Sequence, residues 1–337
     1  MAGNLSLSRL ERVYMAVQGA GSTDDFQTAA SLGNNNYVRH IKAGLTNEIA
    51  TLIRRDKTGA RTRTLGVRGR GYGKWSYEGS LAPSGVNGTT ADFDPLMQSV
   101  FGQAAASANG GLQYSFTDLP ILAFTYASFR QPSTLQQRIA YGCVTQMVTF
   151  NIGQDIAEFT AEGEARFVLN SDYTPTSEEA GLGSVSYTEP SAPVSHGGII
   201  AGFTGSISIG GNDIARIRTA QVKIDAGNFV IKDTFGHYIP DDTEGDVRIV
   251  TLSFTMYDTD EAAQQTIRNA AITKTPVDAN LTVGTVAGSI VNFFLKNVQL
   301  ASYQYDDSGR RFSLTMPESP AFGTSITSKD EIKITLQ

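Results

Sequence analysis

Few residues in this chain have the types and spacing needed for catalysis or metal binding. The sequence contains one cysteine, Cys143, and three histidines, His40, His196 and His237. Together they offer neither a disulfide framework nor a Cys/His zinc pattern. Nucleophilic catalysis requires a positioned base beside the nucleophile, whereas the three histidines lie in turn-rich or polar contexts. Cys143 stands among alternating strand residues, which indicates a packing role.

Acidic and glycine-rich motifs are equally weak indicators of a site. The pair Glu178–Glu179 lies in a Pro/Ser/Gly-rich stretch that could not hold catalytic geometry. Residues 241–246 resemble a calcium loop but lack its alternating ligands, and a solvated turn is the better interpretation. Residues 69–73 have the wrong glycine spacing for a dinucleotide site. The sequence therefore predicts no catalytic residue, no cofactor-binding residue and no metal ligand, and we expect no enzyme.

Charge is distributed unevenly along the chain. The formal net charge is −6, but residues 39–74 contain ten basic and two acidic side chains, so this segment is +8 and the remainder −14. Such asymmetry suggests contact with nucleic acid or association of surfaces of opposite sign. Residues 66–73 look like an arginine–glycine nucleic-acid tract, but an inter-subunit arm and a solvated loop are alternatives. We favour the arm, with candidate residues Arg54, Arg55, Lys57, Arg61, Arg63, Arg68, Arg70 and Lys74.

Composition indicates a large β-rich protein. The 337 residues are enough for about two domains, only 18% of them are charged, and 34 are glycine. No apolar stretch approaches the ~18 residues of a membrane-spanning helix. The first residues lack the uncharged core of a signal peptide. We therefore expect no membrane insertion, and a protein made in a cytoplasm and soluble there.

Period-2 alternation of apolar and polar residues is the main local pattern, and it predicts antiparallel strands that are buried on one face. It is clearest in residues 250–257, 311–316 and 332–336. Short helices are predicted at 94–101, between Asp94-Pro95 and Gly102, and at 262–270, where Asp258 and Glu261 have capping-box spacing. The spacing of apolar residues in 5–17 predicts a third helix.

The order of these elements repeats along the chain. In each half an extended segment precedes a strand, the strand precedes a helix, and further strands follow, as two diverged copies of one unit would require. The predicted organisation is a helical or extended segment over residues 1–36, a first β domain with a basic arm (about 53–73), a linker and a second β domain. The corresponding ranges are 37–170 for the first domain, 171–198 for the linker and 199–337 for the second domain.

On these features the sequence resembles the tail tube (major tail) proteins of long-tailed bacteriophages, which are related to the tube proteins of type VI secretion systems. The resemblance covers roughly residues 37–337. It rests on the order and local character of the basic arm, the predicted strands and the first helix, at residues 53–63, 73–83, 92–102, 141–150, 162–164, 203–209, 248–257 and 303–309.

This resemblance implies a mainly β fold with two tandem tail-tube-like β-sandwich or barrel domains, each with one short flanking helix and a long loop arm. It also implies a structural virion subunit whose rings stack into a conduit for DNA ejection. Six such domains form a ring in the family, so two domains per chain would give a trimer with pseudo-sixfold symmetry, whereas one functional tube domain would give a hexamer. The implied partners are tape-measure, tail terminator and baseplate or tip proteins, together with double-stranded DNA passing transiently and without sequence specificity.

The implied location is the tail of a virion assembled in the cytoplasm of a bacterial host. A DNA conduit should repel phosphates, because neutralisation by Lys and Arg would hold the strand. Glu158, Glu162 and Glu164 are therefore candidates for the lumen wall. The alternative from another class is a non-enzymatic β-sandwich binding module of a virion that recognises a host surface or a carbohydrate.

Overall fold

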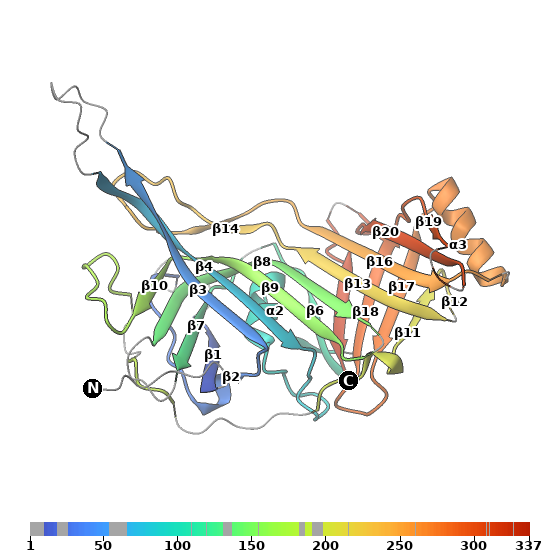
Figure 1. Ribbon diagram of the computed structural model, residues 1–337, viewed down its shortest axis with the longest axis horizontal. Coiled ribbons are helices and arrows are strands. Elements are labelled where there is room, and N and C mark those ends of the chain that lie inside the picture. The colour runs from blue at the N-terminus through green and yellow to red at the C-terminus, as the bar shows by residue number, and fades with distance from the viewer. Residues whose placement is uncertain are drawn as a thin grey trace.

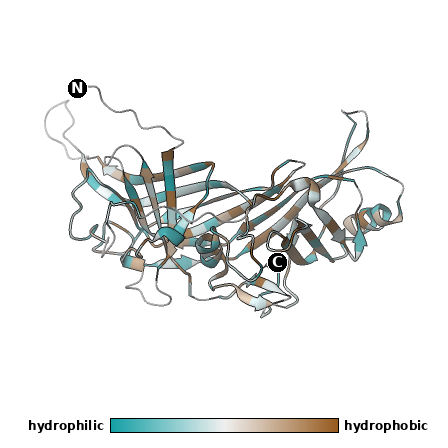
Figure 2. Cartoon of the chain, turned by 90° about the horizontal axis from the view of Figure 1, so that it is seen from below, coloured by the Kyte–Doolittle hydropathy of each residue, from teal (hydrophilic) through white to brown (hydrophobic). Residues whose placement is uncertain are grey.

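The computed structural model describes residues 10–18, 26–53, 66–108, 110–118, 120–130, 137–153, 155–181, 186–190, 198–214, 216–259, 261–307, 309, 311–325 and 327–337. Within these residues the protein is mainly β, with large antiparallel sheets, which confirms the expected fold class. Along the strands, hydrophilic and hydrophobic residues alternate (Figure 2).

One antiparallel sheet, here named the long sheet, extends through both halves of the chain (Figure 1). It belongs to the 12-stranded sheet, and its strands follow the order β3-β4-β9-β8-β13-β16-β20-β19. The first half contributes β3 (Lys42–Leu52), β4 (Val67–Ser80), β8 (Arg138–Ile152) and β9 (Glu158–Ala165). The second half contributes β13 (Ile217–Asp225), β16 (Ile249–Tyr257), β19 (Gln304–Asp306) and β20 (Ser313–Ala321).

Strand β8 is long enough to pair with different strands along its two parts. Its second part pairs with β13, whereas its first part pairs with β7 and continues that sheet through β1 to β2. Strand β10 pairs with the same first part of β8 on the other side. The bounds of these strands are β1 (Glu11–Val17), β2 (Tyr37–Val38), β7 (Phe124–Arg130) and β10 (Phe167–Asn170).

A 7-stranded sheet covers the inner face of the long sheet, in the order β12-β11-β17-β18-β21-β6-β5. The core lies between the two sheets, where the Phe150 and Phe293 ring centroids are 4.9 Å apart. The strands are β5 (Ala106–Ala108), β6 (Gly111–Ser115), β11 (Ser206–Ile209), β12 (Asn212–Asp213), β17 (Val277–Val283), β18 (Val291–Val298) and β21 (Ile332–Leu336).

Both helices expected in the two halves are present. Helix α2 (Asp94–Phe101) has Pro in its first turn and ends at Gly102 in the left-handed conformation, as the sequence predicted. Helix α3 (Ala262–Thr273) follows Glu261, which has no side-chain cap hydrogen bond, and Asp258 pairs instead with Arg268 at 2.6 Å. Short 3₁₀ turns are present at η2 (Asn34–Asn36) and η3 (Gly202–Thr204).

The expected helix over residues 5–17 is wrong for the part that the structure describes. Residues Glu11–Val17 form β1, which pairs with β7 on one side and β2 on the other. Val13, Tyr14, Met15 and Ala16 are all buried, because both faces of β1 are covered. A strand buried on both faces loses the alternation that distinguishes it from a helix.

The repeated order of elements is visible in the sheet itself. Within the long sheet the strands of the two halves follow the same order, β3-β4-β9-β8 in the first half and β13-β16-β20-β19 in the second. In each case the last strand of the half in sequence lies third and the strand before it lies fourth. In each half a helix follows the second strand, α2 after β4 and α3 after β16. This arrangement is consistent with two copies of one unit, while the domain boundaries given above stay a prediction.

The connection between the first two strands differs in form between the halves. In the first half β3 and β4 continue as a hairpin that projects from the molecule, and we name its described outer part, residues 49–53 and 66–71, the arm (Figure 1). In the second half the equivalent connection, residues 226–248, is named the strap; it contains the small sheet of β14 (Asn228–Val230) and β15 (Thr243–Gly245). Arm and strap lean in the same direction (Figure 1).

Candidate assembly interface

The outer face of the long sheet is largely uncovered by the rest of the described chain, and we name it the open face. Its side chains are mostly small and polar, because the alternate residues of each strand point inward to the core. Two shallow depressions lie on this face, one over each half of the sheet. One row of neighbouring residues across the strands illustrates this polar character: Lys42, Glu78, Thr160, Thr149, Lys223 and Thr251.

Charges on the open face are partly paired and leave an acidic excess. Lys42 pairs with Glu78 at 3.0 Å, and Lys223 with Glu318 at 3.5 Å. Glu158 and Glu162 lie on this face without an ion-pair partner in the described part of the chain. Two of the three proposed lumen-wall acids therefore lie where a partner or a passing polyanion could meet them.

Glu164 occupies a different environment from the other two acids. Its side chain is only 7% exposed, since the strap covers it. Lys232 of the strap forms an ion pair with the Glu164 carboxylate, and the main-chain N–H of Val230 donates to it at 3.3 Å. Glu164 thus joins the two halves of the chain and is not part of the open face.

The pairing of β8 with β13, which we name the joint, links the two halves into one sheet. Its register runs from Ala220 opposite Ile152 to Asp225 opposite Met147. The joint is fully antiparallel and continuous, so each half uses a sheet edge of the other to satisfy its main-chain hydrogen bonds.

The two ends of the long sheet have no such partner. Strand β3 pairs only with β4, and β19 pairs only with β20, among the strands that the structure describes. All three residues of β19 are exposed, and so is most of β3. Edge strands of this kind can pair with a strand of another chain. On β3 the Leu45 carbonyl already accepts a hydrogen bond from Arg138 at 3.0 Å.

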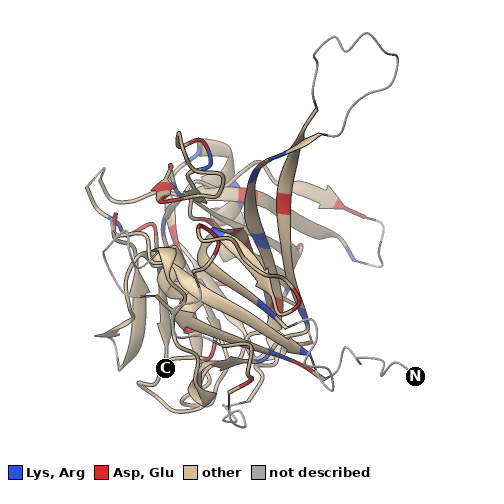
Figure 3. Cartoon of the chain, turned by 90° about the vertical axis from the view of Figure 1, so that its left-hand side faces the viewer, with Lys and Arg blue, Asp and Glu red and all other residues tan. Residues whose placement is uncertain are grey.

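The expected basic arm is partly a strand, because residues 67–73 belong to β4. Arg54, Arg55, Lys57, Arg61 and Arg63 lie outside the described residues. The glycines and the basic side chains alternate in β4, so that Gly71 and Gly73 occupy the side where other atoms approach closely. A Cβ at Gly73 would lie 3.0 Å from the Cβ of Ala165. The Gly-Arg pattern therefore reflects close packing within a strand (Figure 3 shows its charges).

The three described basic residues of this segment have partners within the chain. Arg68 pairs with Glu179 at 2.5 Å and lies over the Tyr238 ring at 5.3 Å. Arg70 donates to the carbonyl oxygens of Lys232 and Thr234, both at 3.2 Å. Lys74 pairs with Glu48 at 2.7 Å. Basic side chains of β4 thus fix the strap and the segment around residue 179 against the hairpin.

Glu179 is the most enclosed acid of this region. Its side chain has no exposed surface, and it accepts hydrogen bonds from the Tyr173 hydroxyl at 2.8 Å and from the Thr176 N–H at 2.9 Å, besides Arg68. Burial opposes its charge, but these hydrogen bonds outweigh burial and hold the pKa of Glu179 below its ordinary value. This part of the expected linker therefore packs on the first half at Arg68, while Thr176 and Glu178 contact Tyr238 and His237 of the strap.

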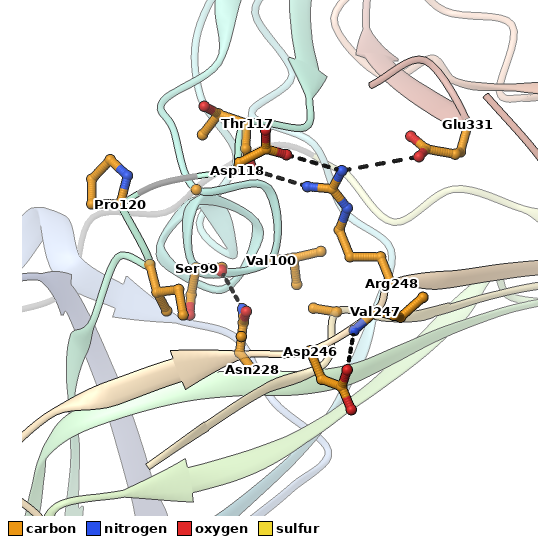
Figure 4. A pocket seen from close by; sticks show the side chains of 14 residues that line it. Ser99, Val100, Thr117, Asp118, Pro120, Asn228, Asp246, Val247, Arg248 and Glu331 are labelled. Carbon is orange, nitrogen blue, oxygen red and sulfur yellow. Dashed lines mark hydrogen bonds and ion pairs between the residues drawn. The ribbon is translucent and has the colours of Figure 1, made fainter. Parts of the chain in front are cut away.

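A cavity of about 390 Å³ lies where α2, the strap and the C-terminal segment meet (Figure 4). Arg248 crosses it, donating to the Thr117 carbonyl at 2.9 Å and approaching Asp118 at 3.5 Å and Glu331 at 3.9 Å. Asn228 donates to the Ser99 carbonyl at 3.0 Å from the other side. Most polar groups in this cavity satisfy one another, which indicates a structural contact between the halves.

The residues first considered for chemistry are dispersed. Cys143 is fully buried, which confirms its packing role and raises the pKa of its thiol. His237 lies in an exposed turn, as expected, with its Nδ1 3.1 Å from Glu178, and burial lowers the pKa of His40. His196 lies outside the described residues. Residues 241–246 supply the short edge strand β15.

Comparison with known proteins gives no assignment: no family model matches the chain, and no match was found among curated proteins. Within the part of the chain that the structure describes, no helix has the length and apolar character needed to cross a membrane.

Proposed function

We propose that this protein is a structural subunit of a bacteriophage tail tube, which assembles through the free edges of the long sheet into rings that stack around a lumen. One observation supports this most strongly: the chain already contains one joint between two similar units. The edges that form the joint, β8 and β13, have the same places in their units as the free edges β19 and β3. A joint of this type between copies is heterologous, and it closes into a ring after a fixed rotation.

The number of copies follows from the resemblance to tail tube proteins. Six units per ring and two units per chain give three chains with pseudo-sixfold symmetry. The open face then lines the lumen, with its small polar side chains and its acidic excess at Glu158 and Glu162. The lysines of this wall, Lys42 and Lys223, are each paired with a glutamate, and the remaining charge is acidic, so double-stranded DNA could pass without being held.

The joint also gives a register for the contact between copies. Thr149 of β8 lies opposite Lys223 of β13 in the joint. By their positions relative to the neighbouring strands, Thr149 corresponds to Gln304 of β19, and Lys223 corresponds to Thr46 of β3. Gln304 of one copy should therefore lie opposite Thr46 of the next.

A charge exchange at these two exposed positions tests the proposal. Thr46→Glu with Gln304→Glu places like charges opposite each other between copies, whereas Thr46→Glu with Gln304→Lys places opposite charges there. We expect rings and tubes of the wild type and of the Glu/Lys variant in electron micrographs of concentrated protein, and loss of assembly in the Glu/Glu variant. Circular dichroism should show the same fold in all three.

Persistent monomers of the wild type, even with a tape-measure partner supplied, would contradict the tube and favour the binding module. Equal assembly of the two double variants would contradict the proposed edges and register.

A further inference from the structure

The strap shows how one unit covers its neighbour beyond the sheet pairing. Val230 of the strap is buried with Phe26, Ala123 and Val144 of the first half. Next to it, Lys232 pairs with Glu164 and lies 4.0 Å from the centre of the Tyr72 ring. The strap therefore extends from the second unit over the outer side of the long sheet in the first unit, where it covers Glu164 and Tyr72.

The arm holds the equivalent place in the first unit. Ser80 and Tyr257, at the ends of β4 and β16, each pair with the first residue of the next strand in the sheet. Counting back from them aligns Tyr72 with Ile249, and their partners in the preceding strand are Glu48 and Asp225. The connections between these pairs, residues 49–71 and 226–248, have equal length.

Apolar side chains of the arm lack the cover that the strap residues have. In this alignment Ile53 corresponds to the buried Val230, yet Ile53 is 59% exposed. Leu52 is also 59% exposed and Val67 of the opposite strand 56% exposed, but these two correspond to Phe229 and Glu244, on the side of the strap that faces away from the first unit. Isolated exposed apolar residues are common, but several on one projecting hairpin indicate a contact surface.

The second half has an equally uncovered surface where the first half receives the strap. Ile249 aligns with Tyr72, which Lys232 covers, but Ile249 is 51% exposed. The register of β16 with β20, Val250 opposite Ala321, places Phe322 beside Ile249, and Phe322 is 49% exposed. Val247, two residues before Ile249, is 75% exposed. We name Val247, Ile249 and Phe322 the receiving patch.

From these equivalences we propose that the arm of one copy docks on the receiving patch of the second half of a neighbouring copy. This inference rests on the proposed ring, because the neighbour that presents its β19 to β3 is the one whose second half lies beneath the arm. The contact is apolar: Ile53 packs against Val247, Ile249 and Phe322, while Arg68 and Arg70 stay with their partners in the same chain. The basic side chains of β4 thus position the arm, and the apolar ones bind the neighbour.

Disulfide trapping between two differently tagged copies tests the contact. One copy has Ile53→Cys and the other Ile249→Cys; the native Cys143 is fully buried and should not interfere. Mixed under assembly conditions and oxidised, they should form a heterodimeric cross-link that mass spectrometry maps to positions 53 and 249. The matched control replaces Ile249→Cys by Ile272→Cys on α3, which is 66% exposed and lies outside the patch. This control should give little cross-link.

A second variant tests the same contact without oxidation. Val247→Asp should leave the folded chain intact, because the side chain is exposed. It should, however, raise the protein concentration needed for ring formation at least tenfold. Ile272→Asp should not. Rings that form without the 53–249 cross-link, and that tolerate Val247→Asp, would overturn the docking proposal and leave the proposed function standing. Failure of the wild type to form rings at all would overturn both.

Discussion

Replacement of Glu179 by Gln offers a quantitative test of how the base of the arm is held. The Glu179 side chain is fully buried and accepts hydrogen bonds from Arg68, Tyr173 and Thr176. A hydrogen bond to a charged group contributes about 1.5–3 kcal/mol to stability. Glutamine keeps one accepting oxygen but removes the charge, so we expect Glu179→Gln to lower the free energy of unfolding at pH 7 by about 2–3 kcal/mol.

The pH dependence of this loss identifies its cause. The pKa of Glu179 in the folded protein lies below its ordinary value of 4.5, so its contribution is present above that value and is lost as pH falls through the folded pKa. The difference between wild type and Glu179→Gln should therefore be constant from pH 8 to about 6 and shrink below about 4.5.

Urea unfolding of both proteins between pH 8 and 3.5 measures this difference. Glu162→Gln, on the exposed open face, is the matched control and should change stability by less than about 0.5 kcal/mol. A loss in Glu179→Gln that stays the same down to pH 3.5, or one no larger than that of the control, would refute the role given to the Glu179 charge.

Three further substitutions test packing and the contact between the halves. Trp75→Phe removes an indole N–H that donates to two main-chain carbonyls at 3.1 Å each, and should cost about 1–3 kcal/mol in urea unfolding; an unchanged midpoint would contradict this. Gly73→Val should cost about 1–3 kcal/mol by the same measurement, because a Cβ would already lie 3.0 Å from that of Ala165, and a neutral effect would show that β4 has room. Lys232→Met leaves the Glu164 carboxylate buried without its cation, and should speed hydrogen exchange in residues 226–234; unchanged exchange would mean that the ion pair does not hold the strap.

The sequence was informative where local pattern and burial agree. Alternation predicted the strand at Ile249–Tyr257 because one of its faces is in the core and the other is open. Pro95 and Gly102 marked the bounds of α2 because they act through the local backbone. The helix expected over 5–17 is wrong because β1 is covered on both faces. The Gly-Arg residues of the expected arm lie partly in β4, and their period of two is that of a strand.

The candidate interface depends on contacts between residues far apart in the chain. No local pattern gives the register of β8 with β13, since it joins residues 147–152 to 220–225 across the strand order of the sheet. Glu164 fitted the expected acidic wall by its spacing from Glu162, yet the strap covers it. Sequence alone could place these acids on one strand face but could not show which segment lies over that face.

Cryo-electron microscopy of assembled rings tests the central claim most directly, namely that the free edges of the long sheet join copies in the way that β8 joins β13. We predict three chains per ring, with β19 of each chain paired antiparallel to β3 of the next, Gln304 opposite Thr46, and the open face toward the lumen. Rings in which β3 or β19 remains unpaired, or in which the open face points outward, would contradict it.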